Sequence, residues 1–190
     1  MVKFFKELWE IIKFVFFNMD DSKNEVKEPA DLDVPHETPI VNLNALHLYN
    51  TGKISLGRRL TLDSSVPINL GCAQAVSKVL YDTKFTSIPK RGLSGTASLL
   101  KWCEENPSLF EKLDEPEKGC VIISPTGKGN GVTRGHTGIL GELGKMMPDD
   151  YAIMSNNSIT GKWDTQWSLT RWKDFYGVYG GLPVHYFRLK

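Results

Sequence analysis

The 190-residue chain has few cysteines, and their spacing excludes two common classes of small protein. Cys72, Cys103 and Cys120 are the only three, and no pair has the C-x-x-C spacing of a zinc ribbon. Three cysteines, a small and odd number, also cannot form the set of paired disulfides that holds a small secreted domain together. We therefore expect no metal site and no cofactor, and at least one thiol is left without a cysteine partner.

The chain also lacks a strong excess of charge of either sign. It has 23 Lys+Arg against 22 Asp+Glu, a net charge of +1, and no basic run. Nucleic-acid binders usually carry a large basic excess, so no nucleic-acid partner is expected. The near-neutral total conceals three segments of different net charge, which is +1 for residues 1–17, −5 for residues 18–39 and +5 for residues 40–190. The positive charge of the last segment would attract an anionic polymer.

A long apolar run is missing as well. The first segment, MVKFFKELWEIIKFVFF, is interrupted by five charged side chains, and nothing in it approaches the roughly 20 apolar residues that cross a bilayer. Its apolar residues instead follow helical spacing, which predicts an amphipathic helix over residues 1–17. Three roles stay open for it: peripheral contact with a membrane interface, docking on the protein or a partner, or an atypical signal anchor.

Residues 18–39 have the composition of a linker. They hold many carboxylates, three prolines and few large apolar side chains, which is too polar to offset the entropy cost of ordering the segment. We predict an acidic flexible linker over residues 18–39 and a folded domain over residues 40–190.

The hydrophobic period changes along residues 40–190. Helical spacing predicts one helix from Cys72 and another over 96–105, capped by Ser94 or Thr96. Alternating or β-rich runs follow at 120–124, 138–141, 151–155 and 184–189. Helices followed by an antiparallel meander predict the α+β class.

Two shorter stretches are harder to interpret. Residues 40–49 are ambiguous, and the Asn-Thr-Gly sequence at 50–52 predicts a turn. A short helix is expected over 168–176, with Leu169, Trp172 and Phe175 facing inward.

Cys72 has the local setting of a reactive thiol. It follows Gly71 and stands at the predicted start of a helix. A helix N-terminus carries partial positive charge and free N–H groups, which lower a thiol pKa and can receive an oxyanion. A buried, inert cysteine is the alternative. Cys103, on an apolar helix face, and Cys120, within a strand, are expected in the core.

A nucleophilic thiol needs a base, and His136 is the best placed of the four histidines. It lies between glycines in TRGHTGILG and leads directly into a strand, which gives the imidazole clearance and a rigid mount. The next predicted strand ends at Asn156 and Asn157, whose amides could fix the imidazole tautomer. Strand alternation sends these two side chains to opposite faces. We expect Asn156 to be the orienting residue, because it lies further inside the strand, with Asn157 as the alternative.

Together these features resemble the papain-like cell-wall peptidases of the NlpC/P60 and CHAP type. The shared pattern is a cysteine that opens a helix, Gly-His-Thr-Gly-Ile on a following strand and a polar residue on the next. The stretch from Ser155 to Trp163 looks like phage-encoded and prophage-encoded members, and the similarity covers about residues 65–190. The resemblance implies a papain-like core and a peptidoglycan hydrolase that cuts a peptide or amide bond, with Cys72 as nucleophile, His136 as base and Asn156 or Asn157 as orienter.

The resemblance also implies a partner and a location. Peptidoglycan is the expected partner, and the protein would reside in the host cytoplasm before release and then act at the cell wall, as a monomer. A catalytically silent papain-like module that binds the wall or a partner is the alternative. Trp163, Trp167 and Trp172 either stack on sugar rings or pack in the core, and Arg134 either meets a substrate carboxylate or is solvated.

Overall fold

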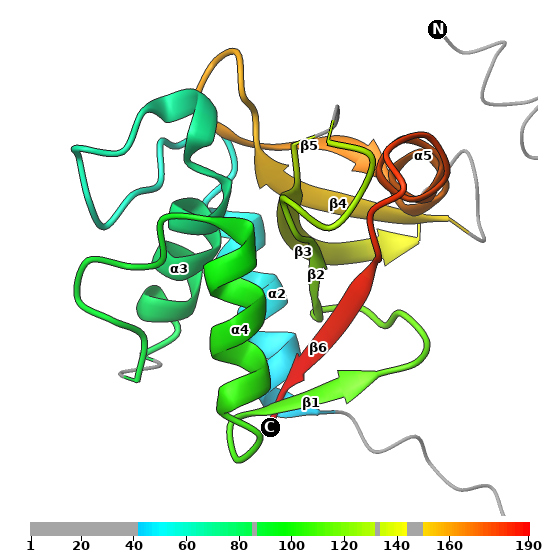
Figure 1. Cartoon of the computed structure of the whole chain (residues 1–190). Coiled ribbons are helices and arrows are strands. Elements are labelled where there is room, and N and C mark those ends of the chain that lie inside the picture. Colours follow the sequence, from blue (N-terminus) through cyan, green and yellow to red (C-terminus); the bar gives the residue numbers. More distant parts are fainter. Residues whose placement is uncertain (1–41, 85–86, 132–133, 144–149) are drawn as a thin grey trace, which may run out of the picture. The chain divides into compact units, whose positions relative to one another are not determined.

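The computed structural model describes residues 42–84, 87–131, 134–143 and 150–190 (Figure 1). All of them belong to one compact unit, Ile40–Lys190. The predicted helix over residues 1–17 and the predicted linker over residues 18–39 lie outside the described residues.

The described part of the chain is an α+β domain, the class that the sequence predicts. Its secondary structure, in chain order, is α2 (Leu43–Ile54), the 3₁₀ turn η1 (Ile68–Leu70), α3 (Cys72–Asp82), α4 (Thr96–Glu105), β1 (Phe110–Leu113), β2 (Val121–Ser124), β3 (His136–Leu143), β4 (Tyr151–Asn156), β5 (Trp163–Ser168), α5 (Leu169–Trp172), the π-helical segment η2 (Lys173–Tyr179) and β6 (His185–Leu189).

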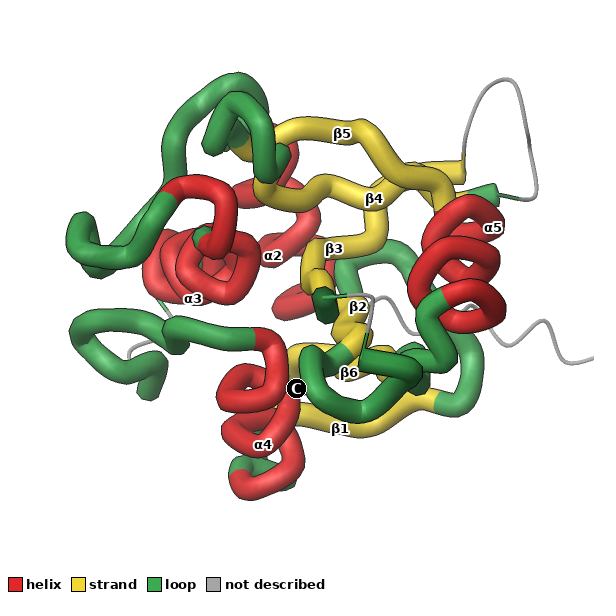
Figure 2. Tube along the Cα trace, turned by 45° about the horizontal axis from the view of Figure 1, so that its top comes forward, coloured by secondary structure: helices red, strands yellow, loops and turns green. Residues whose placement is uncertain are grey.

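The six described strands form one antiparallel sheet with the order β1-β6-β2-β3-β4-β5. Helices cover both faces. Helices α2, α3 and α4 lie on one side of the sheet, and α5 lies on the other, as both views show (Figures 1 and 2). Each face buries a hydrophobic cluster of its own, one beneath α2 to α4 and one beneath α5 and η2.

Strand alternation assigns the side chains of β3 and β4 to these two clusters. Ile139 pairs with Met154, and both belong to the cluster beneath α2 to α4. Leu140 pairs with Ile153, and both belong to the cluster beneath α5. Because neighbouring residues of a strand point to opposite faces, β3 and β4 can supply side chains to either side of the sheet.

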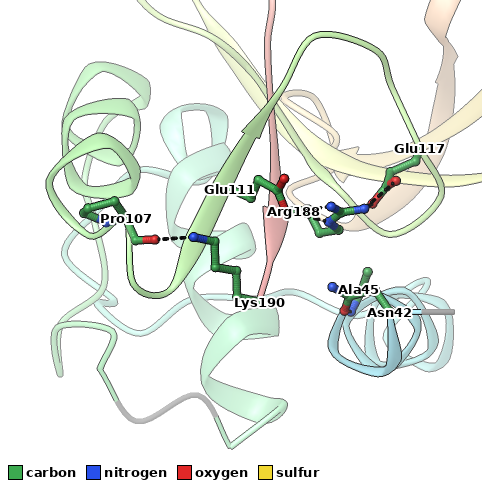
Figure 3. Close-up of polar contacts among 7 residues, drawn as sticks. All are labelled: Asn42, Ala45, Pro107, Glu111, Glu117, Arg188 and Lys190. Carbon is green, nitrogen blue, oxygen red and sulfur yellow. Dashed lines mark hydrogen bonds and ion pairs between the residues drawn. The ribbon is translucent and has the colours of Figure 1, made fainter. Parts of the chain in front are cut away.

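The predicted turn at residues 50–52 is wrong, because these residues continue α2. Gly52 is there for close packing: a Cβ on it would lie 3.0 Å from the Met154 methyl group. Its carbonyl accepts a hydrogen bond of 3.0 Å from the buried indole of Trp163. The helix begins at a side-chain cap, since Asn42 accepts from the Ala45 N–H at 2.9 Å (Figure 3).

Two details of the other helices also differ from prediction. The N-cap of α4 is Gly95, with no side-chain cap, because the Thr96 hydroxyl bonds to Thr126 instead. In the helix after β5, Leu169 and Trp172 are buried as expected, but Phe175 is 43% exposed and Tyr176 takes the inward position. The chain is π-helical from Lys173 onward, and the wider turn returns to the inward face at the fourth residue after Trp172, which is Tyr176.

The strands β1 and β6 close one edge of the sheet through charged side chains. Arg188 on β6 reaches Glu111 at 2.6 Å and Glu117 at 3.1 Å, and the Lys190 ammonium donates to the Pro107 carbonyl at 2.7 Å (Figure 3). The hydrogen bond from Arg188 lowers the pKa of the Glu111 carboxyl. Neither β1 nor β5 is predicted from the sequence, because both runs are short and polar.

Candidate active site

A cleft of about 720 Å³ opens at the end of the sheet where β3 begins and β4 ends. Strand ends, helix N-termini and one loop supply its walls. The described lining residues are Asn69, Leu70, Cys72, Ser94, Gly95, Thr96, Thr126, Arg134, Gly135, His136, Asn156, Ser158, Gln166, Trp167 and Tyr176. Three of the four residues selected from the sequence, Cys72, His136 and Asn156, therefore share one cleft.

Cys72 is the first residue of α3, as predicted, and it is partly exposed. The backbone amides of Ala73, Thr137 and Cys72 itself lower the pKa of the thiol, but burial outweighs them and raises this pKa to about 11. The expectation of a depressed thiol pKa is thus wrong: the thiol is neutral at pH 7. The Thr137 amide belongs to the residue that follows His136, so the sulfur lies against the start of β3.

His136 is the first residue of β3 and lies within an aromatic cage. Its ring stacks on Trp172 at 5.2 Å and on Tyr176 at 5.7 Å, each at an angle of 25°, and Trp167 lies 6.4 Å away. This burial lowers the pKa of the imidazole to about 4. His136 is therefore neutral at pH 7 and able to accept a proton. Tyr176 links the two groups, because it also lies within electrostatic reach of Cys72.

Asn156 and Asn157 have different surroundings. The buried Asn156 amide donates to the Ile68 carbonyl at 2.9 Å, which fastens η1 directly before Cys72. The Asn157 side chain accepts from the backbone N–H groups of Ile159 and Thr160 at 2.9 and 3.1 Å. Asn157 thus shapes the turn between β4 and β5 and is not among the described lining residues of the cleft. The orienting role remains a prediction for either side chain.

Hydrogen bonds of Thr96 and Thr126, here called the threonine clasp, fix the backbone that leads to His136. The Thr96 hydroxyl, at the start of α4, accepts from the Thr126 N–H at 2.9 Å, and the two hydroxyl oxygens are 3.2 Å apart. The Thr126 hydroxyl also accepts from the Gly135 N–H at 2.9 Å. The clasp connects α4 to both ends of the loop between β2 and β3, so it fixes the backbone immediately before His136.

Several lining residues are not found by sequence reasoning. Gln166 reaches the cleft because it is the extra residue of a β-bulge, opposite the step between Ile153 and Met154. A bulge depends on strand pairing, so no local pattern marks it. Arg134, by contrast, is predicted from the sequence either to meet a substrate carboxylate or to be solvated, and it lines the cleft. It is exposed and is the one ionised side chain among the described lining residues.

Burial decides which of the tryptophans and cysteines named above belong to the core and which can reach the cleft. Trp163 and Trp172 are fully buried and pack in the core, while Trp167 is half-buried and lines the cleft. Cys103 and Cys120 are buried, as predicted, and burial raises the pKa of each thiol to about 12.

The described residues contain no group of three or more His, Cys, Asp or Glu side chains placed to hold a metal ion. Within the same part of the chain, no helix has the length and hydropathy needed to cross a membrane. In comparisons of the sequence with known proteins, no protein-family model matches, and no curated protein matches either.

Proposed function

We propose that the protein is a papain-like cysteine hydrolase that cuts a peptide or amide bond of peptidoglycan. The observation that carries the proposal is the shared cleft, where a cysteine at a helix N-terminus and a neutral histidine at a strand start lie with Asn156. These are the three groups that thiol acyl transfer needs: a nucleophile, a base and an amide beside them.

In the proposed reaction, the imidazole of His136 accepts the thiol proton while the Cys72 sulfur attacks the substrate carbonyl carbon. The first N–H groups of α3 have no helical acceptor and can bind the resulting oxyanion. The imidazolium then protonates the leaving nitrogen as its bond to carbon breaks, which leaves a thioester on Cys72. His136 next deprotonates a water molecule that attacks the thioester, and the carboxylic acid product leaves as the thiol re-forms.

At rest, Cys72 is a neutral thiol and His136 a neutral imidazole. In the proposed reaction the proton moves from the thiol to the imidazole only as the sulfur attacks the substrate. Moving the proton across pKa values of about 11 and about 4 costs about 9 kcal/mol before the attraction between the new charges is counted. A turnover of ten per second corresponds to a barrier of about 16 kcal/mol. The transfer therefore fits within the barrier of an ordinary enzyme, provided that the attack follows directly.

The character of the cleft favours a substrate with carboxylates. Arg134 is its single ionised side chain among the described residues, and two helix N-termini, of α3 and α4, contribute to its walls. Helix N-termini and arginine both favour anions. The stem peptides of peptidoglycan carry free carboxylates next to amide bonds, and the net charge of +5 on residues 40–190 would attract such a polymer.

The test is wall clearing by the full chain and by two site variants. Cys72→Ala and His136→Gln should each abolish clearing, whereas His47→Gln, which changes an exposed histidine on α2, should retain it. Mass spectrometry of the digested wall identifies the new termini and separates an endopeptidase from an amidase. Full clearing by Cys72→Ala, with an unchanged melting temperature, would refute the proposal.

The high thiol pKa favours a second candidate, a catalytically silent module that binds the wall or a partner protein. A neutral thiol at about pKa 11 is a poor nucleophile at rest. If the protein is a silent binding module, the wild-type chain should clear no wall under any condition. It should also bind wall fragments with the same affinity as the Cys72→Ala variant.

A further inference from the structure

An aromatic strip, made of Trp167, Phe175 and Tyr179, runs from the candidate active site to the surface. Trp167 lines the cleft, and its ring contacts Phe175 with centroids 5.5 Å apart. Phe175 stacks on Tyr179 at 6.0 Å and 29°, one helical turn further along η2. Phe175 is 43% exposed and Tyr179 63% exposed. The ring planes are inclined by 46° between Trp167 and Phe175, so the strip is a run of tilted rings in contact that leads from the cleft to two partly exposed side chains.

Polar groups border the strip where it enters the cleft. The bulge in β5 places Gln166 beside Trp167, and its amide nitrogen makes one long contact, 3.5 Å to the Asn156 carbonyl. The Arg171 guanidinium lies 4.8 Å over the Trp167 ring and so covers one face of that ring. The strip thus pairs apolar ring faces with a planar amide.

The helix that carries the strip is itself unusual. Residues Lys173–Tyr179 form a π-helical segment of seven residues, whereas π-helices are mostly single turns and are frequent at functional sites. A π-helix has i→i+5 hydrogen bonds and therefore more residues per turn than an α-helix, so it places successive side chains at different angles around the axis. Here it places Tyr176 against His136 while Phe175 and Tyr179 face outward.

We propose that the aromatic strip, with Gln166, is a saccharide-binding subsite that takes the glycan strand beside the bond to be cut. The C–H face of a sugar ring packs on an aromatic face, and its hydroxyl and N-acetyl groups hydrogen-bond to a planar amide. The inference rests on the proposed function, because it assigns the sugar part of the same substrate to a surface that adjoins the cleft at Gln166 and Trp167.

The size of the surface supports a sugar over a protein. The two exposed rings of the strip, Phe175 and Tyr179, together offer about 200 Å² of accessible surface. A stable partner protein or a second copy of the chain needs about 800 Å² on each side. A short oligosaccharide fits the smaller area, and the rings continue into the cleft where the attached peptide would lie.

Binding is tested with the full chain carrying Cys72→Ala, so that no turnover intervenes, and with a soluble N-acetylglucosamine oligomer as the probe. Calorimetry should give saturable binding, and Trp167 should report it through tryptophan fluorescence. Phe175→Ala and Tyr179→Ala should each weaken binding about five- to ten-fold. Val178→Ala is the matched control, because it removes an exposed apolar side chain from the same helix but no ring.

Conservative variants separate recognition from folding. Phe175→Tyr and Tyr179→Phe keep the rings and should retain the affinity of the parent, and melting temperatures identify any variant that fails to fold. Absence of saturable binding, or an equal loss in Val178→Ala, would overturn the inference. Binding to anionic lipid vesicles with none to the oligomer would also overturn it, in favour of a membrane surface.

The outcome is independent of catalysis. If the oligomer binds as described but the wild-type chain clears no wall, the subsite stands and the hydrolase proposal fails. If the chain clears wall while Phe175→Ala and Tyr179→Ala change neither binding nor clearing, the hydrolase proposal stands and the subsite fails.

Discussion

Gln74 is expected to be the most important polar side chain for the stability of the helix that carries Cys72. It is 1% exposed on α3, two residues after the cysteine. Its oxygen accepts from the backbone N–H groups of Leu62 and Asp63, both at 3.0 Å, and its nitrogen donates to the Arg91 carbonyl at 2.9 Å. One amide therefore fastens two separate loops to α3.

The loss in Gln74→Leu follows from the three bonds of 3.0 Å or shorter, since a fourth, from the Thr61 hydroxyl, is 3.4 Å long and weak. The variant keeps the approximate volume of the side chain and removes all of these hydrogen bonds. A net contribution of about 1 kcal/mol for each bond gives a loss of about 3 kcal/mol in the free energy of unfolding. For a folded unit of this size, that corresponds to a fall of roughly 6–12 °C in melting temperature. Activity should fall as well, because the loop that follows Arg91 leads to the cleft wall at Ser94 and Gly95.

Calorimetric melting and urea denaturation of the full chain measure the effect. Gln166→Leu is the matched control, because Gln166 is the only other glutamine, is half-buried and makes one contact of 3.5 Å. We expect a shift of no more than about 1 °C there, given a weak and partly solvated bond. If Gln74→Leu melts within 2 °C of the wild type, the two loops are held by other contacts and the reasoning is wrong.

Two further predictions follow from the titration of the paired groups. Alkylation of the partly exposed Cys72 by iodoacetamide should be slow at pH 7 and accelerate toward its pKa of about 11, while the buried Cys103 and Cys120 are protected in the folded chain. Fast labelling at pH 6 would contradict a thiol that is neutral at that pH. The folded-state pKa of His136, about 4, is below the ordinary 6.5, so the protein should lose about 3 kcal/mol of stability as the pH falls from 6.5 to 4. Urea denaturation at several pH values measures this loss, and His136→Gln should lack it. Equal dependence of stability on pH in the two chains would refute the prediction.

Sequence reasoning succeeds where the signal is local and periodic. The starts of α3, β3 and β4 depend on a few neighbouring residues, and these three elements carry Cys72, His136 and Asn156 into one cleft. The α+β class follows from the same periods. The local sequence therefore places the candidate site residues on the correct elements, but it gives no distance between them.

The features that sequence reasoning misses depend on pairing and packing. Gly52 has the composition of a turn, yet it lies within α2 because Met154 and Trp163 approach its backbone closely. Gln166 enters the cleft only through a bulge that exists once β5 pairs with β4. The packing of Gly52 depends on residues about 100 positions along the chain, and the bulge at Gln166 depends on residues about ten positions away. The hydrophobic pattern around either residue carries no information about these partners.

The charge state of Cys72 is the clearest case of tertiary structure outweighing local sequence. A helix N-terminus stabilises an anion by about 0.3–1 kcal/mol at an exposed position and about 2 kcal/mol when partly buried. The rise in the thiol pKa from 9.0 to about 11 corresponds to about 3 kcal/mol in the opposite direction, after the amides have acted. Burial is therefore the larger effect. Tyr176, over 100 residues along the chain from Cys72, stacks on His136 and also lies within electrostatic reach of the thiol, so the surroundings of this pair depend on residues that no local pattern around Cys72 includes.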